Sequence, residues 1–67
     1  MVTIQFRDAE SNDDALLVVR ASNDREKIGL CLSLKNDGDL EVWLTTMDAS
    51  RVIEALRTVH SSLVSLG

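Results

Sequence analysis

Hydrophobic and polar residues alternate along several short segments of the chain, the pattern of β-strands that bury one face. In residues 2–8, hydrophobic side chains occupy every second position: Val2, Ile4 and Phe6. Residues 28–34 and 40–45 alternate in the same way, with Ile28, Leu30, Leu32 and Leu34 in one and Leu40, Val42 and Leu44 in the other. These segments predict three strands of one antiparallel sheet.

A further segment, residues 15–21, is rich in β-branched and aliphatic residues and predicts another strand. Its alternation is poor, because one face would carry Leu17 and Val19 while the other carries Leu16 and Val18. The pattern does not decide which pair faces the core. Either choice leaves two large aliphatic side chains on the opposite face of the sheet.

The polar break between the last two strands indicates how they pair. A two-residue turn would place Leu34 opposite Glu41 and mix hydrophobic and polar faces. A three-residue loop, residues 36–38, instead pairs Lys35 with Asp39 and keeps the faces matched. We therefore predict the three-residue loop.

This register has two consequences. Gly38 would occupy the left-handed backbone position that such a loop requires. Cys31 would lie opposite Trp43, on the face of the sheet that points away from the hydrophobic core.

From about residue 47 the hydrophobic period becomes helical, and one stripe collects Ala49, Val52, Ile53, Leu56, Val59, His60 and Leu63. Thr45 followed by Asp48 resembles a capping box, with Thr46 as an alternative cap. We predict a helix over about 47–65, with Gly67 as its terminator.

These elements predict one α+β domain over residues 1–67. Its architecture is an antiparallel β-meander of about four strands followed by one C-terminal amphipathic α-helix packed on one sheet face. In this arrangement Ile53 and Leu56 pack on Leu30, Leu32 and Val42.

A chain of 67 residues has little capacity to bury a core. A domain of this size buries only about 60% of the surface that its unfolded chain exposes. Cys31 is the single cysteine, so no disulfide can form within the chain, and Cys31 and His60 are too few for a zinc site. We expect no metal and no cofactor, and we expect oligomerisation to supply the missing buried area.

Charge and hydropathy exclude several partners. The formal net charge is −4, and the seven basic residues are scattered along the chain, so direct binding of nucleic acid is not expected. No hydrophobic run reaches the roughly 20 residues that span a bilayer, and no signal peptide precedes the first strand. We expect a cytoplasmic protein that does not contact a membrane.

The chain offers little material for catalysis, and we do not expect an enzyme. The spacing around Gly38 does not fit a calcium loop, and the carboxylates of the first loop, at Asp8, Glu10, Asp13 and Asp14, are expected to be solvated. Cys31 and His60 should lie on opposite sides of the sheet, too far apart to act together. His60 is expected to be a partly buried packing residue at the end of the helical stripe.

The outer face of the predicted sheet carries the best candidate for a binding surface. Trp43 is the only tryptophan, and a partly exposed tryptophan beside aliphatic side chains is typical of a protein interface. We predict an interface formed by Trp43, Cys31, Leu16, Val18 and Gly29. The alternative is that Trp43 only covers the sheet by lying over Gly29.

No family is identified from these residues. We expect a small non-enzymatic protein-interaction module, working as a homodimer, in contact with another protein, or both. In size alone the chain is similar to accessory proteins of phages and mobile elements, such as anti-CRISPR inhibitors of host proteins. The alternative is a small-ligand-binding or regulatory domain with a pocket between sheet and helix, near His60.

Overall fold

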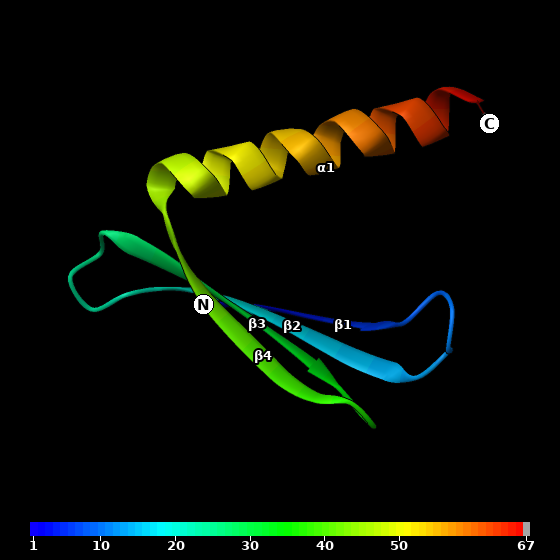
Figure 1. Ribbon diagram of the computed structural model, residues 1–67, viewed down its shortest axis with the longest axis horizontal. Coiled ribbons are helices and arrows are strands. Elements are labelled where there is room, and N and C mark those ends of the chain that lie inside the picture. Colours follow the sequence, from blue (N-terminus) through cyan, green and yellow to red (C-terminus); the bar gives the residue numbers. More distant parts are fainter. Residues whose placement is uncertain (67) are drawn as a thin grey trace.

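The computed structural model describes residues 1–66 and contains one sheet and one helix (Figure 1). The strands are β1 (Val2–Arg7), β2 (Asp14–Ala21), β3 (Lys27–Leu34) and β4 (Gly38–Thr45), and they pair antiparallel in the order β1-β2-β3-β4. Helix α1 (Thr46–Leu66) follows β4 directly and lies over one face of the sheet. The predicted meander with a C-terminal helix is confirmed. The terminating role predicted for Gly67 lies outside the described residues.

Strand pairing assigns every side chain of the sheet to one of two faces. Val19 pairs with Val2 and with Leu30, so Leu17 and Val19 share the face of the hydrophobic residues of β1 and β3. We call this the inner face, because α1 lies over it. Leu16 and Val18 lie on the outer face, which settles the choice that the sequence pattern left open.

All charged residues of the four strands lie on the outer face. They occupy the positions that alternate with the inner side chains: Arg7, Asp14, Arg20, Lys27, Asp39 and Glu41. The inner face is therefore built entirely from hydrophobic residues and Gly38.

The predicted register of the last hairpin is wrong by two residues. Leu34 pairs with Gly38 instead of Leu40, so the loop comprises residues 35–37. In this register Cys31 pairs with Glu41, and Trp43 pairs with Gly29. A shift of two residues preserves the alternation of faces, so the hydrophobic pattern could not detect it.

The turn itself follows the predicted chemistry. The Asp37 amide donates a hydrogen bond to the Leu34 carbonyl at 3.3 Å, and Gly38 then re-enters the sheet with a φ of 80°. A positive φ at Gly38 is as expected, because glycine lacks the Cβ that strains this conformation.

Helix α1 starts at a side-chain cap. The Asp48 amide donates a hydrogen bond to the Thr45 hydroxyl at 3.1 Å, which confirms Thr45 as the N-cap. Because the cap belongs to the last residue of β4, the chain passes from sheet to helix without a loop. This junction holds the first turn of α1 over the end of the sheet.

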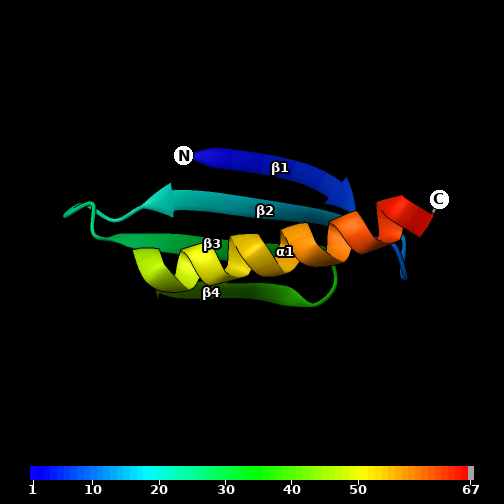
Figure 2. The same cartoon turned by 90° about the horizontal axis from the view of Figure 1, so that it is seen from above.

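Beyond its first turns, α1 leaves much of the inner face uncovered. Within residues 1–66 the helix contacts β3 and β4 but neither β1 nor β2 (Figure 2). Ala15 and Ala49 are the only hydrophobic side chains of the described part that are buried. The chain by itself therefore has almost no core.

The packing predicted for the middle of the helix is wrong for this reason. Leu56 is 67% exposed and Ile53 is also exposed, so neither is buried against Leu30, Leu32 and Val42. His60 is exposed as well, not partly buried. The hydrophobic stripe lies on the side of the helix that the sequence predicts. The sheet, however, is too far from the second half of the helix to cover that part of the stripe.

We expect Gly38→Val to destabilise the protein by about 1–2 kcal/mol, because a β-branched residue is strained at positive φ. No atom lies within 4 Å of the position that a Cβ would take, so the cost comes from the backbone alone. Gly38→Asn is the control, since asparagine tolerates this conformation and should cost less. Denaturant unfolding at matched protein concentration measures both, and equal stability of the two variants would contradict the assigned turn.

Candidate interaction surfaces

The structure presents two hydrophobic surfaces of different character. The outer face carries the five residues of the predicted interface, at the centre of a polar surface. The other, which we call the inner surface, combines the inner face of the sheet with the hydrophobic stripe of α1. The first is partly covered by its own polar side chains, and the second is largely open.

On the outer face, the Trp43 ring lies directly on Gly29. A Cβ placed on Gly29 would meet a carbon of the ring at 2.9 Å, which is closer than real side chains approach. Glycine is thus needed here to let the indole lie against the backbone of β3. The indole still exposes a large fraction of its surface, as Trp43 is 42% exposed.

Arg20 also lies over this ring. It pairs with Gly29 from β2, and its guanidinium carbon lies 5.3 Å from the centroid of the Trp43 ring, within cation–π range. The same guanidinium forms an ion pair with Glu41 at 3.0 Å. Arg20, Gly29 and Trp43 therefore form one row across three strands, anchored on β4.

Sequence reasoning missed Arg20. The signal was available only after β2 had been assigned its faces, because Arg20 shares the outer face with Leu16 and Val18. A flat guanidinium stacks well on an aromatic ring, so the charge of Arg20 does not oppose a place beside tryptophan.

The remaining predicted interface residues lie beside this row. Cys31 pairs with Val18 on one side and with Glu41 on the other, so it does not face Trp43 as predicted. Leu16 pairs with Ser33, one step further along the sheet. Cys31, Leu16 and Val18 are all half-buried, which leaves Trp43 as the most exposed member of the group.

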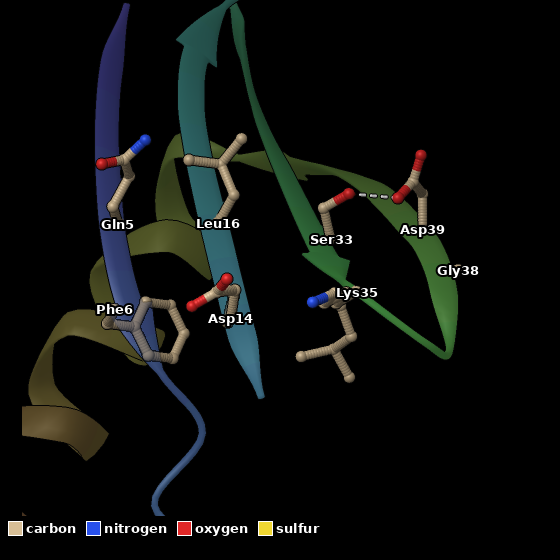
Figure 3. Close-up of a pocket in the computed structure, with 10 residues that line it drawn as sticks. Gln5, Phe6, Asp14, Leu16, Ser33, Lys35, Gly38 and Asp39 are labelled. Carbon is tan, nitrogen blue, oxygen red and sulfur yellow. Dashed lines mark hydrogen bonds between the residues drawn. The ribbon is translucent and has the colours of Figure 1, made fainter. Parts of the chain in front are cut away.

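A hollow of about 740 Å³ opens at the end of the sheet that carries the β3–β4 turn (Figure 3). Its outer side is lined by Gln5, Leu16, Ser33 and Asp39, and the Ser33 hydroxyl donates a hydrogen bond to the Asp39 carboxylate. Asp14 and Lys35 add charge at its edge. The Ser33–Asp39 bond ties β3 to β4 beside the turn.

A second hollow, of about 380 Å³, lies next to Trp43 and is lined by Arg20, Ala21, Ser22, Asn23 and Trp43. The loop that borders it is held by the Asp24 carboxylate. This carboxylate accepts hydrogen bonds from the Ser22 hydroxyl and from the Glu26 amide, and these bonds lower the pKa of Asp24 from 3.8 to about 2. The loop is thus fixed in position beside the tryptophan.

The other acidic and nucleophilic candidates do not assemble into a site. The Asp8 carboxylate accepts hydrogen bonds from the amides of Glu10 and Ser11, which lowers the pKa of Asp8 and closes the β1–β2 loop. Within residues 1–66, no three His, Cys, Asp or Glu side chains group where they could hold a metal ion. His60 lines neither hollow, and Cys31 lies on the opposite face of the sheet from the helix.

The inner surface is exposed to an unusual extent for a folded chain. The accessible surface is 5652 Å², whereas a compact monomer of 7.4 kDa exposes about 4,200 Å². The radius of gyration is 13.7 Å, against about 11 Å for a compact domain of this length. Exposed large hydrophobic residues occur in β1, in β4 and along α1. The chain by itself therefore leaves exposed most of the hydrophobic residues that would form a core.

Comparisons with protein-family models, with curated proteins and with solved structures found no match. Among the described residues, no helix is both long enough and hydrophobic enough to cross a bilayer. The two surfaces must therefore be interpreted from their own chemistry.

We expect Gly29→Ala to destabilise the protein by about 1–3 kcal/mol, because the new methyl group displaces the Trp43 ring. In a Trp43→Ala background the same change should be neutral or stabilise by about 0.5 kcal/mol, since alanine restricts the unfolded chain more than glycine does. A double-mutant cycle by denaturant unfolding measures the coupling. An equal cost in both backgrounds would show that the ring does not rest on Gly29.

We expect Ser22→Ala to raise the pKa of Asp24 towards 3.8, because the variant loses the hydroxyl that stabilises the carboxylate. A depressed pKa in the folded state contributes stability above pH 4, and this contribution is lost as the pH falls through about 2. The variant should therefore lose less stability than the wild type between pH 4 and 2. Carboxyl carbon NMR titration gives the pKa directly, and an unchanged value would exclude the Ser22 bond.

Proposed function

We propose that this chain is a small non-enzymatic protein-interaction module that works as a homodimer and associates through its inner surface. The observation that carries the proposal is the excess of exposed surface. It amounts to about 1,400 Å² beyond a compact monomer of the same mass.

This excess has the size of a permanent interface. Two chains that each bury about 1,400 Å² form an interface of about 2,800 Å², within the range of obligate homodimers. Such interfaces resemble a domain core cut in half. An inner face that carries no charged residue fits this description, as does the near absence of a core in the single chain.

The self-association surface proposed here differs from the one that the sequence indicated. Trp43 lies on the outer face, and part of its ring is already covered by Gly29 and Arg20. The inner surface is larger and has no such cover. A dimer formed through it leaves the outer face accessible, so the predicted role of Trp43, Cys31 and their neighbours in binding another protein stays a prediction.

Two further ideas receive no support from particular residues. Inhibition of a host protein, suggested by size alone, would need the outer face as its binding surface. A small-ligand site near His60 would need an enclosed cavity at the helix, and both hollows described above lie elsewhere.

The proposal predicts that the wild type sediments as a dimer and that its melting temperature rises with protein concentration. Ile4→Glu should weaken the dimer by about 100-fold or more, because an unpaired carboxylate would be buried at the interface. Thr3→Glu is the matched control, since it places the same charge on the outer face of the same strand. Circular dichroism reports folding of each variant.

A wild type that sediments as a monomer at high concentration, while folded, would contradict the proposal. Equal dimer affinities for the Ile4→Glu and Thr3→Glu variants would place the contact elsewhere on the molecule.

A further inference from the structure

Helix α1 leaves its own sheet part of the way along its length. Ala49, in its first turns, is 8% exposed and Val52 is 38% exposed. From its midpoint onwards the hydrophobic stripe is open, and Leu56 and Leu63 are 67% and 66% exposed. Figure 1 shows the same divergence, with the C-terminal end of α1 standing clear of the sheet.

The sheet has a matching open half. Strand β1 has no contact with α1, and Ile4 and Phe6 are 46% and 44% exposed on the inner face. Seen from above, the first half of α1 runs over β3 and β4 and its C-terminal end passes above the end of the β1–β2 hairpin, while most of β1 lies beside the helix, uncovered (Figure 2). Within one chain, the C-terminal half of α1 is therefore not packed on a sheet, and the half of the sheet formed by β1 and β2 is not packed against a helix.

We propose that a second copy of this chain fills this gap, with the C-terminal half of α1 from each subunit lying over β1 and β2 of the other. The two α1 helices then cross antiparallel at Leu56. This inference rests on the proposed function and adds the arrangement of the subunits. Each sheet is covered by two half-helices, its own over β3 and β4 and the partner's over β1 and β2.

A second copy is the occupant that these surfaces favour, because each open surface is complementary to the other. In a twofold symmetric dimer, any contact made by residue i with residue j occurs twice, so one helix–sheet contact closes both gaps. The excess area of about 1,400 Å² per chain is enough for an interface of the size that obligate homodimers form. A hydrophobic surface without charges also suits a copy of itself.

The position of the crossing follows from the length of the helix. Leu56 is the midpoint of α1, so an axis through it gives each half-helix the same partner surface. The hydrophobic residues around it recur at three- and four-residue intervals, as in helices that pack along a shared seam: Ala49, Val52, Leu56, Val59 and Leu63. Leu63 of the partner subunit then lies above Ile4, near the start of β1.

The opposite side of α1 is suited to water. Glu54 and Arg57 form an ion pair at 2.6 Å with both side chains well exposed. Ser61 lies on the same polar side and its side chain is exposed. The helix therefore has one side for the partner and one for solvent.

Cysteine cross-linking tests this arrangement. In a Cys31→Ser background, Leu56→Cys should oxidise to a covalent dimer at least about tenfold faster than Ser61→Cys, because only the first brings two thiols within bonding distance at the axis. Both residues are exposed in the single chain, so exposure alone does not favour either. Sedimentation and circular dichroism first establish that each variant is folded and dimeric.

The double variant Ile4→Cys with Leu63→Cys provides a second test that leaves Leu56, at the proposed crossing, unchanged. It should form a covalent dimer when oxidised, because the partner's Leu63 lies over Ile4. The control pairs Thr3→Cys with Leu63→Cys, which places the first thiol on the outer face and should not cross-link.

The outcomes separate this inference from the proposed function. Faster cross-linking at both test sites supports the exchange of half-helices. A wild-type dimer in which neither test site exceeds its control overturns the arrangement and leaves the homodimer standing. A folded monomeric wild type overturns both.

Discussion

The structure depends on a mismatch between the width of its four-stranded sheet and the single helix available to cover it. Four strands present an inner face with no charged residue, and a single helix capped by Thr45 can follow only one line across it. The helix contacts β3 and β4 and leaves β1 uncovered. A hydrophobic face of this extent is unfavourable in water at about 25 cal/mol per Å², so covering the open half would stabilise the fold. The proposed association would supply that cover.

The row Arg20–Gly29–Trp43 holds the other face together and defines how the strands pair. Because Gly29 has no side chain, the indole can lie on β3, and because the indole lies there, Trp43 must pair with Gly29. Arg20 adds a cation–π contact from β2 and an ion pair to Glu41 on β4. Three strands are therefore linked in one register by side chains, independently of the inner face. The outer face provides the specificity that a uniformly hydrophobic inner face lacks, since aliphatic side chains accept a shift of two residues with little penalty.

Much of the fold could be predicted because alternation, turn residues and capping act locally. The four strands, the helix, the Thr45 cap and the positive φ of Gly38 all follow from such signals. The register of the last hairpin could not be predicted, because it depends on how Trp43 fits Gly29 across the sheet. The predicted burial of Leu56 was wrong because the hydrophobic pattern shows which side of a helix avoids water but not how far the sheet lies from that side. Of the candidate site, the position of Trp43 on the outer face could be predicted. The contact between Arg20 and the Trp43 ring could be inferred only once the residues of β2 had been assigned to the inner and outer faces.

In the proposed dimer the two faces would have different roles, the inner one in stability and the outer one in recognition. If the inner surfaces of two copies close on each other, every hydrophobic residue of the core is used for assembly, and the only face left to meet another molecule is the outer one. That face carries the charged residues of the strands and, on the edge strand β4, an indole that is 42% exposed. The outer face of each sheet would stay accessible in such an assembly, because neither outer face takes part in the proposed contact. A partner that recognises Trp43 would then be bound twice by one dimer, and its apparent affinity would depend on dimerisation even though no residue of the inner surface touches it.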